Sequence, residues 1–194
     1  MNSGSTRIAA LPRVVGLCGR SGAGKDVVAT HLVERHGYRR LAVADHLKHV
    51  MALAFNMTDE QLWGAGRNEI DPRWGRTPRE MYQQLGDALR AIHPDAVLNG
   101  WRNALTEAIG NGELIVVPDI RMPVELDVLH RLGGVVWRIV RPVPSLGGAT
   151  AAHATETACD EMVVEAVIEN SADIDSLFLH IDERLGSRFW DRRR

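Results

Sequence analysis

Residues 19–26 read Gly-Arg-Ser-Gly-Ala-Gly-Lys-Asp, which matches the phosphate-binding pattern G-x-x-x-x-G-K-[ST] up to its last position. Glycines let backbone N–H groups converge on phosphate oxygens, and a lysine adds a full positive charge. The apolar run Val14–Cys18 precedes the loop and a helix-period segment follows it, which is the order that the motif requires. The sequence therefore predicts a nucleoside triphosphate site formed by Gly19, Arg20, Ser21, Gly22, Ala23, Gly24, Lys25 and Asp26.

Asp26 stands where the pattern has a hydroxyl residue. A serine or threonine would offer its hydroxyl to Mg²⁺, and an aspartate offers a hard anionic oxygen that suits the same ion, directly or through water. The alternative is that Asp26 only favours the helix that begins there, because negative charge is stabilising at a helix N-terminus.

A second acidic residue follows an apolar strand. Leu114–Val117 leads through Pro118 to Asp119, an arrangement typical of the second Mg²⁺-site acid of P-loop enzymes, although many buried strands end in aspartate. Arg121, two residues later, could stand beside the phosphates. With the loop upstream, we predict Asp26 and Asp119 as the metal-site residues.

Arginines bracket the end of another apolar run, Val135–Val140. Arginine makes planar, bidentate contacts with phosphate and can stabilise charge in a transition state. Arg141 opens a Pro- and Gly-rich segment and is predicted as a catalytic residue together with Lys25 and Arg121. Arg138 fits either this role or that of an ordinary strand residue.

Further cations and amides lie on or beside one expected helix, which begins with a Thr cap at Thr77 and a proline at the first turn. A monophosphate acceptor needs cations for its phosphate and amides for a base edge, whereas the alternative is a solvated, charged face. The residues concerned are Arg76, Arg79, Gln83, Gln84 and Arg90.

Short apolar runs alternate with helical patterns, which predicts an α/β fold with parallel strands. The expected strands are Val14–Cys18, Arg40–Val43, Leu114–Val117, Val135–Val140 and about Glu165–Glu169. The expected helices are 25–35, 45–55, 77–92, 95–109, 123–132 and 173–185. Two irregular stretches, 56–76 and 142–155, are typical of functional loops or lids. Trp63 and Trp74, in the first of them, could stack on a base or simply pack the loop.

Length and composition are those of one globular domain: 194 residues, 45% hydrophobic and 25% charged, with a net charge of −2. That balance gives no support for nucleic-acid binding. The absence of a signal-peptide pattern and of a long apolar run, together with two widely spaced cysteines, leads us to expect a cytoplasmic protein with neither a disulfide framework nor a membrane span. The histidines at 31, 36, 46 and 49 lack metal-ligand spacing, so surface or packing roles are expected for them.

Seven stretches together are similar to one known family. They are residues 16–26, 44–48, 58–62, 77–80 with 84–86, 117–125, 133–134 with 138–142, and 153–156. In their order and spacing the chain resembles the deoxynucleoside monophosphate kinases of bacteriophages and bacteria. Asp26 is similar to other members of that family, and Thr155 stands where serine is more usual before the glutamate.

The resemblance implies ATP- and Mg²⁺-dependent phosphoryl transfer to a deoxynucleoside monophosphate. It also implies a three-layer P-loop kinase fold with a parallel five-stranded sheet. We expect one domain over residues 1–194, with its core at about 13–187, an acceptor-binding region at about 45–92 and a lid at about 142–155. Its expected partners are small-molecule nucleotides, with a homodimer left open. The predicted acceptor-binding residues are Asp45, Lys48, Arg79, Gln84, Arg90 and Glu156.

Two other functions remain open from sequence. One is a P-loop kinase for a different phosphorylated metabolite, of the dephospho-coenzyme A or phosphomevalonate type. The other is a nucleotide-binding regulator without turnover. The long region 56–92, with its glutamines and arginines, favours a nucleotide acceptor over the first. The arginine set argues against the second, because a sensor needs no acceptor-side cations.

Overall fold

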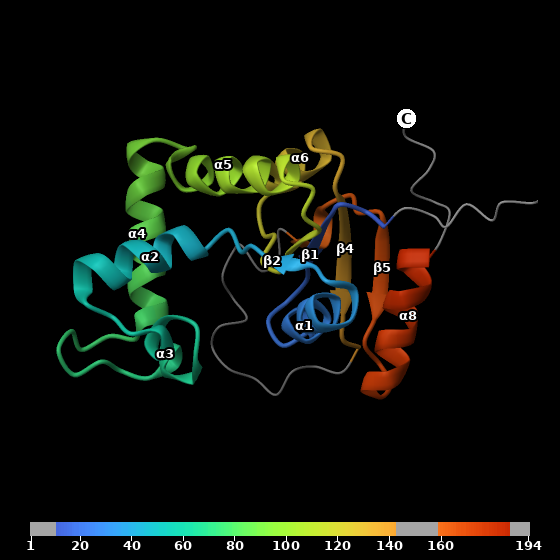
Figure 1. Ribbon diagram of the computed structural model, residues 1–194. Coiled ribbons are helices and arrows are strands. Elements are labelled where there is room, and N and C mark those ends of the chain that lie inside the picture. Colours follow the sequence, from blue (N-terminus) through green and yellow to red (C-terminus); the bar gives the residue numbers. More distant parts are fainter. Residues whose placement is uncertain (1–10, 143–158, 187–194) are drawn as a thin grey trace, which may run out of the picture. The chain divides into compact units, whose positions relative to one another are not determined.

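A computed structural model of the protein describes residues 11–142 and 159–186 (Figure 1). Its centre is a five-stranded sheet in the order β2-β3-β1-β4-β5, and every pairing in it is parallel. The strands are β1 (Val14–Cys18), β2 (Arg39–Arg40), β3 (Ile115–Val117), β4 (Val135–Val140) and β5 (Ala166–Glu169). The prediction of an α/β fold with a parallel five-stranded sheet is confirmed.

Helices cover both faces of the sheet, as near-continuous apolar strands require. Alternate residues of β1 point to opposite faces. Val15 and Leu17 belong to a core cluster with side chains of α1 (Lys25–His36) and α8 (Ile174–Gly186). On the other face, Gly16 lies against Leu129 of α6 (Pro123–Arg131).

The chain divides into two compact units. The first, up to Arg40 and from Ala108 onward, contains the sheet with α1, α6 and α8. The second, Leu41–Glu107, contains α2 (Asp45–Phe55), α3 (Asp59–Leu62), the 3₁₀ helix η1 (Ala65–Asn68), α4 (Pro78–Ile92) and most of α5 (Ala96–Gly110). It has its own core of Met51, Met57, Leu62 and Met81.

Helix α4 begins where its sequence predicts. The Glu80 N–H donates to Thr77 Oγ1 at 3.2 Å, and the Thr77 N–H donates to Glu80 Oε2 at 2.9 Å. This reciprocal capping satisfies two N–H groups that an uncapped helix leaves without partners. Backbone bonding to Thr77 is the largest of the effects that hold the pKa of Glu80 below its ordinary value.

The strand expected over Arg40–Val43 is wrong beyond its first residue. β2 ends at Arg40, and the following residues turn into α2. Asp45 directs this turn, because its Oδ2 accepts the Ala42 N–H at 3.0 Å while its own N–H donates to the Ala42 carbonyl at 3.2 Å. The first residue of α2 thus bonds to the backbone groups of Ala42 that a longer strand would have used.

The stretch 56–76, expected to be irregular, contains α3 and η1 and is organised by a buried carboxylate. Asp71 is 4% exposed, accepts a bidentate contact from the Arg73 guanidinium and a 2.8 Å bond from Gln61 Nε2. The Arg73 hydrogen bond, more than any other effect, holds the pKa of Asp71 far below its ordinary value. Trp74 packs edge-on against Phe55, which favours a packing role for it.

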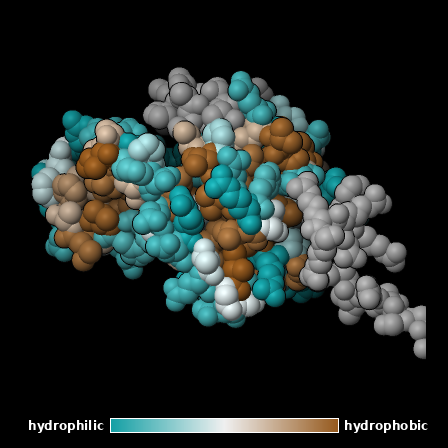
Figure 2. Space-filling view, turned by 90° about the horizontal axis from the view of Figure 1, so that it is seen from above, coloured by the Kyte–Doolittle hydropathy of each residue, from teal (hydrophilic) through white to brown (hydrophobic). Residues whose placement is uncertain are grey.

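Hydrophobic and hydrophilic residues are interspersed on the face of the molecule that Figure 2 shows. Some large apolar side chains are strongly exposed, as Leu53 and Ile92 are at 88% and 80%. Across the described residues, none of the helices combines the length and apolar character needed to span a membrane.

Gly16 offers a test of the packing between β1 and α6. A Cβ at this position would lie 2.4 Å from Leu129 Cδ1 and 3.0 Å from Val136 Cγ2. We expect Gly16→Ala to lower the free energy of unfolding by about 1–3 kcal/mol through overpacking. Gly110→Ala is the matched control, since a Cβ there meets nothing within 4 Å. Equal urea midpoints for the two variants would contradict this account of the packing.

Candidate active site: a phosphate-binding loop at the carboxyl edge of the sheet

The loop between β1 and α1 depends on glycines at three places. Gly19, Gly22 and Gly24 have φ values of 132°, 76° and 106°, a backbone region that residues other than glycine rarely adopt. At Gly19 a Cβ would also lie 2.2 Å from the Ile139 carbonyl oxygen, and at Gly24 it would lie 2.6 Å from Asn170 Nδ2. The backbone therefore forms a tight cradle whose walls are β4 and the end of β5.

Lys25 is the first residue of α1 and folds back over this cradle. Its Nζ donates to the carbonyl oxygens of Gly19 at 2.6 Å and Arg20 at 2.8 Å. These bonds hold the ammonium group over the loop at the N-terminus of a helix, where backbone N–H groups already favour an anion. A half-buried cation in such a position can attract a phosphate group.

Asn170, at the end of β5, buttresses the loop. Its Nδ2 donates to the Ala23 carbonyl at 2.9 Å, and its own N–H donates to the Val140 carbonyl at 2.8 Å. The side chain thus links the edge of the sheet to the turn before Lys25. Sequence reasoning missed this residue, because a lone asparagine after a strand gives no distinctive signal.

Asp26 pairs with a residue at the end of β2. Its Oδ1 accepts from Arg40 Nη1 at 3.0 Å, and both side chains are exposed to solvent. Asp26 also lies in the first turn of α1, where its negative charge favours the helix, so both interpretations of this residue stay open. The carboxylate is accessible at the first turn of the helix.

Asp119 and Arg121 lie in the turn that follows β3, the neighbour of β1. The Ile120 N–H donates to the Leu17 carbonyl at 3.1 Å, which fastens the turn to the end of β1. Because parallel strands present their carboxyl ends at one edge, this turn and the phosphate-binding loop share that edge. Both side chains are half-buried.

Glu125 fixes the backbone of the same turn. It is 8% exposed, and its Oε2 accepts the N–H groups of Arg121 at 2.7 Å and Met122 at 3.0 Å. Burial raises the pKa of Glu125 to about 7, with the nearby charge of Asp119 adding to the rise and the two N–H groups opposing it. An acid three residues into a helix after Met122-Pro123 is a capping signal that sequence reasoning could have used.

The predicted arginines have different surroundings. Arg141 is exposed just beyond the end of β4. Arg138 donates through Nε to the Cys159 carbonyl at 3.0 Å and through Nη2 to the Met162 carbonyl, which supports its reading as a structural strand residue. Arg20, in the loop, pairs with Asp160 at 2.7 Å.

In the second unit, Asp45 and Lys48 are joined through Trp63. The indole N–H of Trp63 donates to Asp45 Oδ1 at 2.9 Å, and Lys48 Nζ lies 3.6 Å from the same oxygen. Lys48 is 6% exposed and sits 5.4 Å from the centre of the Trp63 ring. Trp63 therefore packs its loop through polar and cation–π contacts. Of the two roles that the sequence left open, these contacts favour packing over base stacking.

The other predicted acceptor residues lie along α4. Arg79 Nη1 donates to Asn68 Oδ1 at 3.2 Å, and Arg90 pairs with Asp87 at 2.7 Å. The two arginines share a face but are separated by about 16 Å along the axis, and Gln84 lies about 140° around the helix from Arg79. Because their guanidinium groups bond to different neighbours, we expect Arg79 and Arg90 to serve different parts of a ligand.

The predicted lid at about 142–155 lies almost wholly outside the described residues, and Glu156 lies outside them too. The structure therefore describes two groups of predicted residues, each within its own unit. The loop, Asp119, Arg121 and Arg141 lie at the carboxyl edge of the sheet. The second group is Asp45, Lys48, Arg79, Gln84 and Arg90.

Comparison with known proteins bears on the family. No protein-family model matches the chain. A protein of Acanthamoeba polyphaga mimivirus described as "Putative deoxynucleotide monophosphate kinase" is 32% identical over 143 residues, which make up 66% of this chain and 74% of the relative. The chain belongs to the deoxynucleotide monophosphate kinase family. The chain is thus a P-loop kinase, and a bacteriophage or bacterial type stays a prediction.

Solved structures agree with this fold. TT1252 from Thermus thermophilus matches the kinase with a TM-score of 0.52 and 20% identity, over 91% of this chain and 97% of that one. Dephospho-CoA kinase from Campylobacter jejuni matches with a TM-score of 0.53 and 12% identity, over 91% and 99%. At such identities the likeness extends to the fold alone.

The buttress at Asn170 leads to a prediction for nucleotide binding. In the kinase, Asn170→Ala removes one hydrogen bond to the loop, worth about 0.5–1.5 kcal/mol, so the KM for the triphosphate should rise by about 2- to 10-fold. The neighbouring exposed residue supplies the control, Glu169→Gln. Steady-state kinetics with varied triphosphate test this, and identical KM values for both variants would count against a positioning role.

Glu125 gives the kinase a specific pH dependence. Because its folded-state pKa of about 7 exceeds the ordinary 4.5, the folded state binds more protons in that interval. The contribution of Glu125 to stability should therefore be largest below about pH 4.5 and fall by about 3 kcal/mol as pH rises to 7, with no further change above it. Glu125→Gln should remove this component.

Urea unfolding of wild type and Glu125→Gln at pH 5 and pH 8 measures the difference. The control is Glu183→Gln, which changes an exposed glutamate on α8. Parallel pH profiles for wild type and Glu125→Gln would refute the buried-carboxyl account.

Proposed function

We propose that the protein transfers the γ-phosphoryl group of ATP to a deoxynucleoside monophosphate, forming the diphosphate. The observation that carries the proposal is the cradle at Gly19–Lys25, which admits no side chain at Gly19 or Gly24 and holds an ammonium group over its backbone. The printed name of the mimivirus relative supports the choice of acceptor.

On the donor side, the backbone N–H groups of the loop and Lys25 would bind the β- and γ-phosphates. Asp26 and Asp119 would hold Mg²⁺ or its waters, because the first carboxylate is exposed, the second is only half-buried, and hard oxygen ligands suit this ion. Bound there, Mg²⁺ would neutralise charge on the phosphates. Glu125 and Asn170 act as positioning residues by fixing the two turns that carry these groups.

On the acceptor side, Arg121 and Arg141 of the first unit would offset charge on the transferring group, and Arg79 of the second unit is a candidate for binding the acceptor phosphate. An oxygen of the acceptor phosphate is itself a nucleophile, so the reaction needs no general base. Asp45, Lys48, Gln84 and Arg90 are the further acceptor candidates of the second unit. Residues 142–155, with Glu156, would form a lid that limits ATP hydrolysis by excluding water.

Two features bear on the identity of the acceptor. The second unit contributes arginine and glutamine side chains on α4, the groups that a phosphate and a base edge require. The likeness to a dephospho-CoA kinase concerns the fold, which hosts different acceptors. The competing acceptor class is therefore another phosphorylated metabolite.

A panel assay separates these acceptors. ADP release is measured with ATP and Mg²⁺ against every ribo- and deoxyribonucleoside monophosphate, with dephospho-coenzyme A and phosphomevalonate in separate arms. We expect turnover with at least one deoxynucleoside monophosphate. Turnover with a metabolite arm alone would reassign the acceptor, and ATP binding without turnover in any arm would favour a regulator.

Lys25→Met identifies the site responsible for any turnover found. Loss of one charge-stabilising donor from an active site typically costs 10²–10³ in kcat, so we expect a fall of about 100-fold or more. Arg35→Met, at the far end of the same helix, is the matched control. Undiminished turnover in Lys25→Met would rule out this loop as the donor site.

A further inference from the structure

Two histidines of one helix lie against a single carboxylate of another helix. His31 and His36 are five residues apart on α1, and Asp182 lies on α8. His31 Nε2 lies 2.8 Å from Asp182 Oδ1, and His36 Nε2 lies 2.7 Å from the same oxygen. We call these three residues the His–His–Asp cluster.

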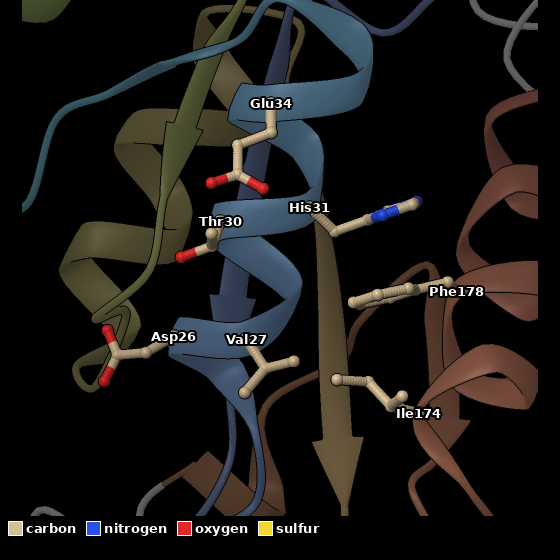
Figure 3. Close-up of a pocket in the computed structure, with 7 residues that line it drawn as sticks. All are labelled: Asp26, Val27, Thr30, His31, Glu34, Ile174 and Phe178. Carbon is tan, nitrogen blue, oxygen red and sulfur yellow. The ribbon is translucent and has the colours of Figure 1, made fainter.

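The cluster is held in place from both helices. The His31 ring stacks on Phe178, one turn before Asp182, with ring centres 4.0 Å apart and planes within 10° (Figure 3). His31 and His36 side chains are only 10% and 20% exposed, whereas Asp182 is 41% exposed. The imidazoles are therefore fixed by packing, and one side of the cluster remains open to solvent.

We propose that the His–His–Asp cluster is a binding site for a zinc-class divalent transition metal that joins α8 to α1. This site is separate from the Mg²⁺ site of the proposed reaction. It would coordinate the metal through two imidazole nitrogens and one carboxylate oxygen, leaving a fourth position for water.

The geometry supports three ligands on one ion. Candidate ligand atoms of the three residues all lie within 4.8 Å of one another. Metal–ligand bonds of about 2.0–2.2 Å place ligand atoms of a tetrahedral site about 3.3 Å apart, so the two N···O contacts need to open by about half an ångström. Small side-chain rotations supply that movement, while the backbones of both helices stay in place.

The donor types select the metal class. Imidazole nitrogens suit Zn²⁺, Co²⁺, Ni²⁺ and Cu²⁺, whereas Mg²⁺ prefers oxygen ligands. The metal must displace protons from the ligating histidines, so its affinity should weaken as pH falls. The competing explanation is that the three side chains only form hydrogen bonds with one another. That explanation predicts no saturable metal binding.

The neighbouring surface gives the site an approach from solvent. An open depression of about 320 Å³ runs along α1 and α8 and is lined by His31 and Phe178 together with Asp26, Val27, Thr30, Glu34 and Ile174 (Figure 3). In Figure 3, His31 and Val27 point toward α8, whereas Asp26, Thr30 and Glu34 lie along α1 farther from α8. The phosphate-binding loop thus lies at the N-terminal end of α1, the helix that the metal would join to α8.

The test uses the full-length, tag-free, metal-stripped protein without nucleotide, because ATP and affinity tags both bind metals. Co²⁺ is titrated and followed by its visible absorption, and Zn²⁺ is then added as a competitor. We expect one equivalent of Co²⁺ to bind and to be displaced by Zn²⁺. At Zn²⁺ concentrations about 100 times the Kd, the unfolding temperature should rise by about 5–10 °C.

Variants locate the site. His36→Gln and Asp182→Asn should each weaken Co²⁺ binding by about tenfold or more, because each removes one ligand of three. His180→Gln, an exposed histidine on α8 outside the cluster, should bind like wild type. Far-ultraviolet circular dichroism confirms that each variant is folded, and Asp182→Asn retains a hydrogen-bonding side chain if His36→Gln does not fold.

Three outcomes would overturn the proposal. They are no saturable binding by the wild type, equal affinity in wild type and both ligand variants, and a sulfur-to-cobalt charge-transfer band. The last would assign the metal to Cys18 or Cys159 instead. Because no step of the assay uses ATP or an acceptor, the result is independent of the proposed kinase activity.

Discussion

The phosphate-binding loop keeps its shape because its backbone lies directly against the end of the sheet. Gly19 packs so close to the Ile139 carbonyl that no Cβ fits between them, and Asn170 ties the far side of the loop to β5. The position of Lys25, the start of α1 and the access of a phosphate to the N–H groups all follow from this contact. A parallel sheet with β1 at its centre is what makes the contact available.

The carboxylates near the phosphate-binding loop are of two kinds, which differ in burial and in the groups they contact. Asp26 is exposed and Asp119 half-buried where a cation is expected, whereas Glu125 is buried and accepts two backbone N–H groups. Burying a carboxylate is costly, which is why the pKa of Glu125 rises to about 7. The turn that carries Asp119 and Arg121 is thus fixed at a cost in stability near neutral pH.

Sequence predicted the centre of the sheet well because β1, β3 and most of β4 are apolar and buried on both faces. Four of five strands and the start of α4 follow from apolar runs and capping residues that act locally. The shortened β2 and the helices within residues 56–76 were missed, because Asp45 and Asp71 act there through specific hydrogen bonds rather than through a repeating pattern. Asn170 and the His–His–Asp cluster were missed because they depend on contacts between residues far apart in sequence.

The surroundings of Trp63 have an optical consequence. A carboxylate accepts its indole N–H while an ammonium group lies over its ring, so the chromophore sits in the field of two opposite charges. Any ligand that draws Asp45 or Lys48 away changes that field and with it the colour and yield of the emitted light. Trp63, one of the five tryptophans of the chain, would therefore respond to a ligand that disturbs Asp45 or Lys48.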